Sequence, residues 1–107
     1  KKLKCCLRKL GIKFLKLKTK TNLKTSDISM LIPHQANLRI SQFVQRQLGL
    51  KDDQVWNNIQ RYGNTTAASI PIALTEAWEA GKVNEGDLIC LAAFGSGFTW
   101  GSALIRW

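Results

Sequence analysis

The sequence predicts a layered α/β fold in which helices pack on a β-sheet. Short apolar runs, typical of buried strands, alternate with longer stretches in which apolar residues recur at helical spacing. The run at residues 88–93 is apolar at every position, so both faces of that strand must be covered. We expect the helices of this chain to form a single layer, so further protein should pack on the other face.

The elements are expected in the order helix, strand, helix, strand, helix, strand, strand. The first helix falls within residues 1–21, where a stripe of leucines and Phe14 is flanked by lysines. The other elements are strands at residues 28–32, 54–59, 88–93 and 99–107, helices at residues 37–48 and 67–80, and turns at residues 22–27, 84–87 and 95–97. Gly49 and Gly81 follow the later helices, as glycine often does. Pro71 suits a first helical turn.

The positive charge is concentrated at the beginning of the chain. Residues 1–25 carry ten Lys and Arg side chains and no acid, whereas residues 26–107 carry six basic and seven acidic side chains. The net charge of +9 therefore belongs to one segment. The alternative interpretation of this chain is a noncatalytic protein whose basic segment binds an anionic membrane or nucleic acid. Lysine runs are, however, often only a solvated face.

The cysteines and the single histidine give no metal signature. Cys5 and Cys6 are adjacent, and Cys90 lies inside an apolar run, where we expect a buried, reduced thiol. No Cys-x-x-Cys spacing occurs, so neither a metal nor another cofactor is expected. The sequence has no apolar stretch of the roughly 20 residues that span a bilayer and no signal-peptide pattern, so we expect a cytoplasmic location.

The strongest functional signal comes from His34 and Asn64. Each is expected on a turn that follows an apolar strand. Two neutral hydrogen-bonding side chains held in this way can stabilise negative charge that develops on a carbonyl oxygen. No cysteine or serine is placed like an activated nucleophile, so the chain resembles half of an active site.

Three motifs resemble those of the β-ketoacyl-[acyl carrier protein] synthase III family. They are LIPHQANLRI at residues 31–40, YGNTTAAS at residues 62–69 and AFGSGFTWGSAL at residues 93–104. The resemblance covers roughly residues 22–107. It implies the C-terminal half of a thiolase-like layered fold, with a mixed sheet flanked by helices. Residues 1–21 depart from the family pattern and would form a separate basic segment that could be helical.

The resemblance also implies a reaction. The family joins an acyl group from acyl-coenzyme A to malonyl-acyl carrier protein, with decarboxylation, to start type II fatty acid synthesis. It uses a Cys–His–Asn triad, of which His34 and Asn64 would be the last two members and would stabilise the enolate. The nucleophilic cysteine is absent from this chain, which alone should be inactive. The backbone N–H of Ser96, where the family usually has glycine, would help to hold the oxyanion of acyl transfer.

The remaining assignments concern partners. Gln35 and Arg39 would contact the acyl carrier protein, and Ala36, Asn37 and Phe94 would line the channel for pantetheine or coenzyme A. The N-terminal half of the synthase would be an obligatory partner, and the full-length family members are homodimers. Neither nucleic acid nor a membrane is expected to bind the synthase domain.

Overall fold

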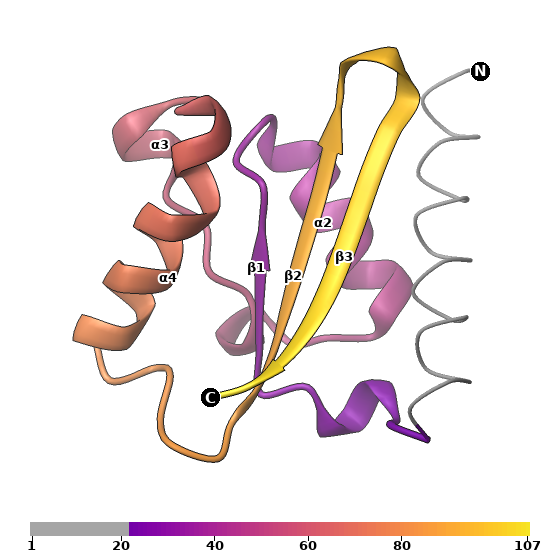
Figure 1. Ribbon diagram of the computed structural model, residues 1–107, viewed down its shortest axis with the longest axis vertical. Coiled ribbons are helices and arrows are strands. Elements are labelled where there is room, and N and C mark those ends of the chain that lie inside the picture. Colours follow the sequence, from indigo (N-terminus) through magenta and orange to yellow (C-terminus); the bar gives the residue numbers. More distant parts are fainter. Residues whose placement is uncertain (1–21) are drawn as a thin grey trace.

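The computed structural model describes residues 22–107, in which a mixed β-sheet carries helices on both faces (Figure 1). Strand β1, Met30–Pro33, runs parallel to β2, Leu88–Gly95. Strand β2 then turns into β3, Thr99–Arg106, and the two pair antiparallel. The predicted α/β class and the mixed sheet are confirmed.

Strands β1 and β2 form the buried centre of the molecule. All four residues of β1 are buried, as are the first three of β2. An apolar strand that is covered on both faces needs no alternation of polar and apolar residues, which explains the continuous apolar runs. The strands predicted at residues 28–32, 88–93 and 99–107 are therefore present, with ends that differ by a few residues.

Helix α2, Leu38–Leu48, forms where the sequence predicts it. Its N-cap is Asn37, whose Oδ1 accepts the backbone N–H of Arg39 at 2.9 Å and so satisfies one free donor of the first turn. The helix ends at Gly49, which adopts the left-handed conformation with φ of 66°.

Helix α4, Ser69–Glu79, also confirms its prediction, although a short 3₁₀ turn at Thr66–Ala68 replaces its expected first residues. Pro71 is the third residue of α4 and lies in the first turn, where the missing N–H costs no helical hydrogen bond. The chain reverses at Gly81 with φ of 70°.

The two helices cover opposite faces of the sheet, which corrects the expectation of a single helical layer. Because neighbouring side chains on a strand point to opposite faces, Leu31 packs in a core cluster with Val44 of α2. The next residue, Ile32, packs in a second cluster with Ala73 of α4. Strand β3 is less covered, since its residues alternate between exposed and half-buried.

The strand predicted at residues 54–59 is wrong. A 3₁₀ turn at Asp52–Gln54 leads to a single bridge between Val55 and Leu31, and the chain then forms the short helix α3, Ile59–Tyr62. The ladder does not continue, because the backbone N–H groups of Asn58 and Ile59 donate to the side-chain oxygen of Gln35 rather than to a strand. The sequence pattern could not reveal that partner.

Some expectations lie outside the described residues. These are the basic helix within residues 1–21 and both of its cysteines. Within residues 22–107, no helix is long and apolar enough to cross a membrane.

Candidate active site

A cleft of about 790 Å³ opens at one end of the sheet. The end of β1, helix α3 and the turn between β2 and β3 all lie at this end, at the top of Figure 1. Five candidate residues from the sequence line the cleft, namely His34, Ala36, Asn64, Phe94 and Ser96. The fold thus brings together side chains from three motifs that are distant in the sequence.

His34 is held by the sheet itself. It follows the last residue of β1, and its backbone N–H donates to the carbonyl oxygen of Ala92 at 2.6 Å, which extends the pairing with β2. Its own carbonyl oxygen accepts the N–H of Ala36 at 3.0 Å and closes a tight turn. Among residues 22–107 the imidazole forms no hydrogen bond and no ion pair, so its nitrogens remain available to substrate or to the rest of the protein.

Asn64 lies on a turn after helix α3, not after a strand as predicted. Its Oδ1 accepts the backbone N–H of Thr66 at 2.9 Å, so the amide is held by its oxygen and its Nδ2 remains free to donate. Thr66 has φ of 51°, in the left-handed region that a β-branched residue rarely adopts, at a cost of about 1–2 kcal/mol. This strain is located next to the group that the site uses.

The glycine turn places Ser96 without backbone strain. The positive φ of this turn, 70°, belongs to Gly97, and Ser96 is not among the described residues with positive φ. The carbonyl oxygen of Ser96 accepts the hydroxyl of Thr99 at 2.9 Å. The Cβ of Ser96 therefore adds no backbone strain relative to glycine at this position.

Gln35 has a structural position that contradicts its predicted contact with a carrier protein. Only 2% of the residue is exposed. Its Nε2 donates to the carbonyl oxygen of Pro33 at 2.8 Å, and its Oε1 accepts the backbone N–H groups of Asn58 and Ile59, both at 3.0 Å. The buried amide has no surface for a protein partner, so this assignment is corrected.

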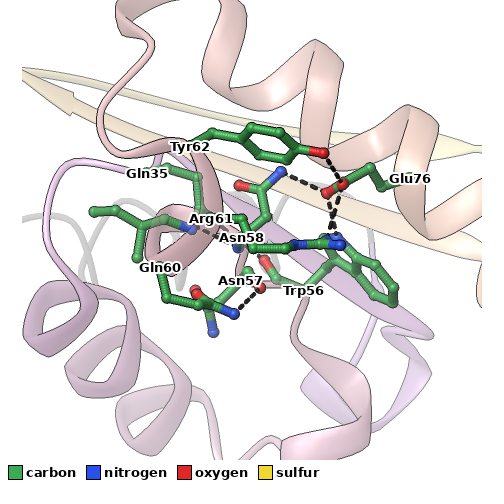
Figure 2. Close-up of polar contacts among 9 residues, drawn as sticks. Gln35, Trp56, Asn57, Asn58, Gln60, Arg61, Tyr62 and Glu76 are labelled. Atoms are coloured by element: carbon green, nitrogen blue, oxygen red, sulfur yellow. Dashed lines mark hydrogen bonds and ion pairs between the residues drawn. The ribbon is translucent and has the colours of Figure 1, made fainter.

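No motif in the sequence singled out Glu76 on helix α4. Figure 2 shows its carboxylate surrounded by donors from the segment before Asn64. Oε1 accepts the hydroxyl of Tyr62 at 2.9 Å and pairs with the guanidinium of Arg61 at 2.8 Å. Oε2 accepts the side-chain N–H groups of Asn58 at 2.7 Å and Trp56 at 3.3 Å.

These contacts change the acidity of two groups. Burial is the largest single influence on the pKa of the Glu76 carboxyl and raises it. Hydrogen bonds from Asn58, Tyr62 and Trp56 lower it, and the nearby guanidinium lowers it further, so the pKa falls below its ordinary value of 4.5. The hydrogen bond to Glu76, and then its negative charge, raise the pKa of Tyr62. Glu76 is therefore a charged anchor at neutral pH.

The comparisons with known proteins identify the family. Residues 19–107 match the family described as 3-oxoacyl-[acyl-carrier-protein (ACP)] synthase III C terminal. The chain belongs to this family.

Its relatives carry the corresponding name. The β-ketoacyl-[acyl-carrier-protein] synthase III of Desulfotalea psychrophila is 58% identical over 81 residues, which are 76% of this chain and 25% of the relative. The synthase III of Campylobacter jejuni is 48% identical over 103 residues, 96% of this chain and 32% of the relative. The crystal structure of the Aquifex aeolicus 3-oxoacyl-[acyl-carrier-protein] synthase III is 46% identical, with a TM-score of 0.90 over 94% of this chain and 33% of that chain.

Two conclusions follow from these lengths. The chain spans about a quarter to a third of the curated relatives, so it matches only their C-terminal part. The Campylobacter alignment also includes most of residues 1–21, which extends the similarity beyond the part that the three motifs cover.

Two further synthase III candidates lie outside the cleft. Asn37 is exposed and uses its side-chain oxygen to cap α2, and its predicted place in the pantetheine channel stays a prediction. Arg39 is exposed on the first turn of α2, and no described residue forms an ion pair with it. Its guanidinium is available to an acidic partner.

Proposed function

We propose that this chain supplies the enolate-stabilising part of the active site of a β-ketoacyl-[acyl carrier protein] synthase III. The whole enzyme would condense an acyl-coenzyme A primer with malonyl-acyl carrier protein, with loss of carbon dioxide, at the start of type II fatty acid synthesis. The observation that carries this proposal is that His34, Asn64 and Ser96 line one cleft in a chain of this family.

The two side chains act on the malonyl thioester. Decarboxylation breaks the bond to the carboxylate carbon, and its electron pair forms an enolate whose charge collects on the thioester oxygen. Nε2 of a neutral His34 and Nδ2 of Asn64 donate hydrogen bonds to that oxygen. The Asn64 amide is suited to this role because its oxygen is already engaged by the Thr66 backbone.

The enolate carbon then attacks an acyl thioester on a cysteine. The new carbon–carbon bond forms as the carbon–sulfur bond breaks, and the cysteine leaves as a thiolate. The oxyanion formed during this step accepts the backbone N–H of Ser96. We expect that cysteine in the N-terminal part of the enzyme. Cys90 is buried, and burial raises the pKa of its thiol, which keeps it protonated. The residues around Cys5 and Cys6 do not resemble the cysteine motif of the family.

Partner recognition belongs to the same proposal. Arg39 is exposed on the first turn of α2 and would pair with an acidic acyl carrier protein. Ala36 and Phe94 line the cleft and would contact the pantetheine arm. A homodimeric full-length enzyme in the cytoplasm is proposed on the family resemblance alone.

The test uses a chimera in which this chain replaces the matching C-terminal third of the Campylobacter jejuni synthase III. We expect the chimera to condense an acyl-coenzyme A with malonyl-acyl carrier protein. The variants His34→Ala and Asn64→Ala should each lose about 10²–10³-fold in rate, because each removes one donor to the enolate oxygen.

Two negative results of this experiment would have different meanings. A folded chimera without condensation activity would refute the proposed reaction. An active chimera that keeps its rate after His34→Ala would instead refute the role of that histidine.

A further inference from the structure

We propose that Gln35 is a positioning residue that fixes the distance between the His34 turn and the Asn64 turn. This inference rests on the proposed function, since it concerns how the two donors reach the same oxygen. Gln35 itself does not line the cleft, and it would act through its neighbours.

One end of the Gln35 side chain is tied to the His34 turn. Gln35 directly follows His34 in the chain, and its Nε2 donates to the carbonyl oxygen of Pro33 at 2.8 Å. A longer contact of 3.5 Å joins the same nitrogen to the carbonyl oxygen of Trp56. The amide nitrogen therefore lies against the backbone of the residue before His34 and against that of the segment before α3.

The other end is tied to the beginning of α3. The Oε1 atom accepts the N–H groups of Asn58, the N-cap of α3, and Ile59, its first residue. The last turn of α3 closes when the N–H of Gly63 donates to the carbonyl oxygen of Ile59 at 2.8 Å. Asn64 follows at once, so it moves with α3.

Apolar packing does not fix the position of α3. None of its four residues is buried, so the hydrophobic effect gives it little anchorage. The polar contacts remain, namely Gln35 on one side and Glu76 on the other, and Glu76 binds the side chains of Asn58 and Tyr62 (Figure 2). Of these two anchors, only Gln35 also belongs to the His34 turn.

The expected consequence of losing this bridge is a misplaced donor. Two backbone N–H groups, that of the buried Asn58 and that of the half-buried Ile59, would lose their acceptor, and α3 would shift to find another partner. A displacement of about 1 Å of a catalytic group can cost about 10²-fold in rate. The effect should fall on kcat, because His34 and Asn64 act on the enolate rather than on the bound thioester.

The experiment compares Gln35→Met with Gln54→Met in the chimera. Gln54 is a matched control, since its amide also bridges two backbone groups, the N–H of Lys51 and the carbonyl oxygen of Ile28, away from the cleft. We expect Gln35→Met to lower kcat about 10–100-fold with KM changed less than about threefold, and Gln54→Met to leave kcat within about threefold.

A conservative variant adds a readout that a merely structural role would not give. The carboxyl group of Gln35→Glu keeps the acceptor for both N–H groups and, when protonated, can donate to Pro33. It should therefore recover most of the kcat that Gln35→Met loses. If Gln35→Met does not fold, Gln35→Asn, which is one methylene too short to bridge, takes its place and should show the same loss.

Amide hydrogen exchange tests the bridge independently of activity. Exchange at residues 58–66 should accelerate by about tenfold or more in Gln35→Met and stay unchanged in Gln54→Met. An inactive chimera that shows this difference refutes the proposed function but supports the bridge. A folded, active Gln35→Met with unchanged kcat and unchanged exchange overturns the inference.

Discussion

Asn64 illustrates how one side chain divides two tasks between its two ends. Its oxygen holds the turn through the N–H of Thr66, and its nitrogen is left for the proposed reaction. The histidine beside it in the cleft is fixed by backbone bonds to β2 and to its own turn. The backbone of His34 and the amide of Asn64 are therefore held by local hydrogen bonds before any substrate arrives.

This division predicts the result of Asn64→Asp. A carboxylate oxygen still accepts the Thr66 N–H, so the unfolding midpoint of the chimera should change little. The donor is lost and a negative charge faces the developing enolate, so condensation should fall by at least about 10²-fold. The control Asn84→Asp alters an exposed asparagine in a distant turn and should keep the rate. A large loss of stability in Asn64→Asp would contradict the proposed division.

The left-handed Thr66 gives a second residue-scale prediction. Asparagine tolerates this conformation better than a β-branched residue, so Thr66→Asn should raise the free energy of unfolding by about 1 kcal/mol. Urea titration of the chimera measures this. The same substitution at Thr75, exposed in helix α4, serves as control, because threonine and asparagine have similar helix propensities. Equal stability of the two variants would show that Thr66 stores no strain.

The three motifs made it predictable that His34, Asn64 and Ser96 meet in one cleft, and their chemical roles stay predictions. The buried position of Gln35 was not predictable. It belongs to the same motif as His34, but its partners Asn58 and Ile59 lie more than 20 residues later. Only the folded arrangement shows that its amide faces inward.

At the scale of elements, α3 is a single helical turn positioned by polar contacts rather than by burial. Residues 54–59 form a 3₁₀ turn, a single bridge and the beginning of α3 in place of the predicted strand. The Gln35 oxygen accepts the backbone N–H groups of Asn58 and Ile59, which a strand would need for pairing. Glu76 accepts the side-chain N–H groups of Trp56 and Asn58. Helix α2 was predictable from its apolar periodicity and from Gly49, and helix α4 from its alanine content, Pro71 and Gly81.

The Glu76 anchor predicts a dependence of stability on pH. Because folding lowers the pKa of this carboxyl, its contribution is fully present above about pH 4.5, the ordinary value, and is lost as pH falls through the lowered value. The difference in unfolding midpoint between the chimera and its Glu76→Gln variant should therefore shrink between pH 6 and about pH 3.

Glu79→Gln is the matched control on the same helix, where the carboxylate is exposed. Its difference from the unsubstituted chimera should stay constant over this range. A Glu76→Gln difference that also stays constant would show that the carboxylate is not anchored by its donors.

On the scale of the whole molecule, the chain has a core on both faces of β1 and β2 but leaves other apolar surface open. Trp78 is 57% exposed and lies 6.3 Å from the ring of Trp107, measured between centroids. Strand β3 keeps one exposed face. These surfaces agree with the expectation from the sequence that further protein packs here, although the reason given there, a single helical layer, was wrong.

The proposed division of the active site between two parts of a protein predicts that the isolated chain performs no condensation. His34 and Asn64 can stabilise an enolate, but no described thiol can carry the acyl group, since Cys90 is buried and protonated. Product analysis of the chain alone with acyl-coenzyme A and malonyl-acyl carrier protein checks this. Formation of β-ketoacyl product would mean that the chain contains its own nucleophile.

The most direct test of the central claim measures carbon dioxide release from malonyl-acyl carrier protein by the chimera without acyl-coenzyme A. This step needs the enolate-stabilising donors but no acylated cysteine. We predict slow release that falls about 10²–10³-fold in both His34→Ala and Asn64→Ala. Release that is unaffected by either substitution would contradict the account, because the two residues would then not stabilise the enolate.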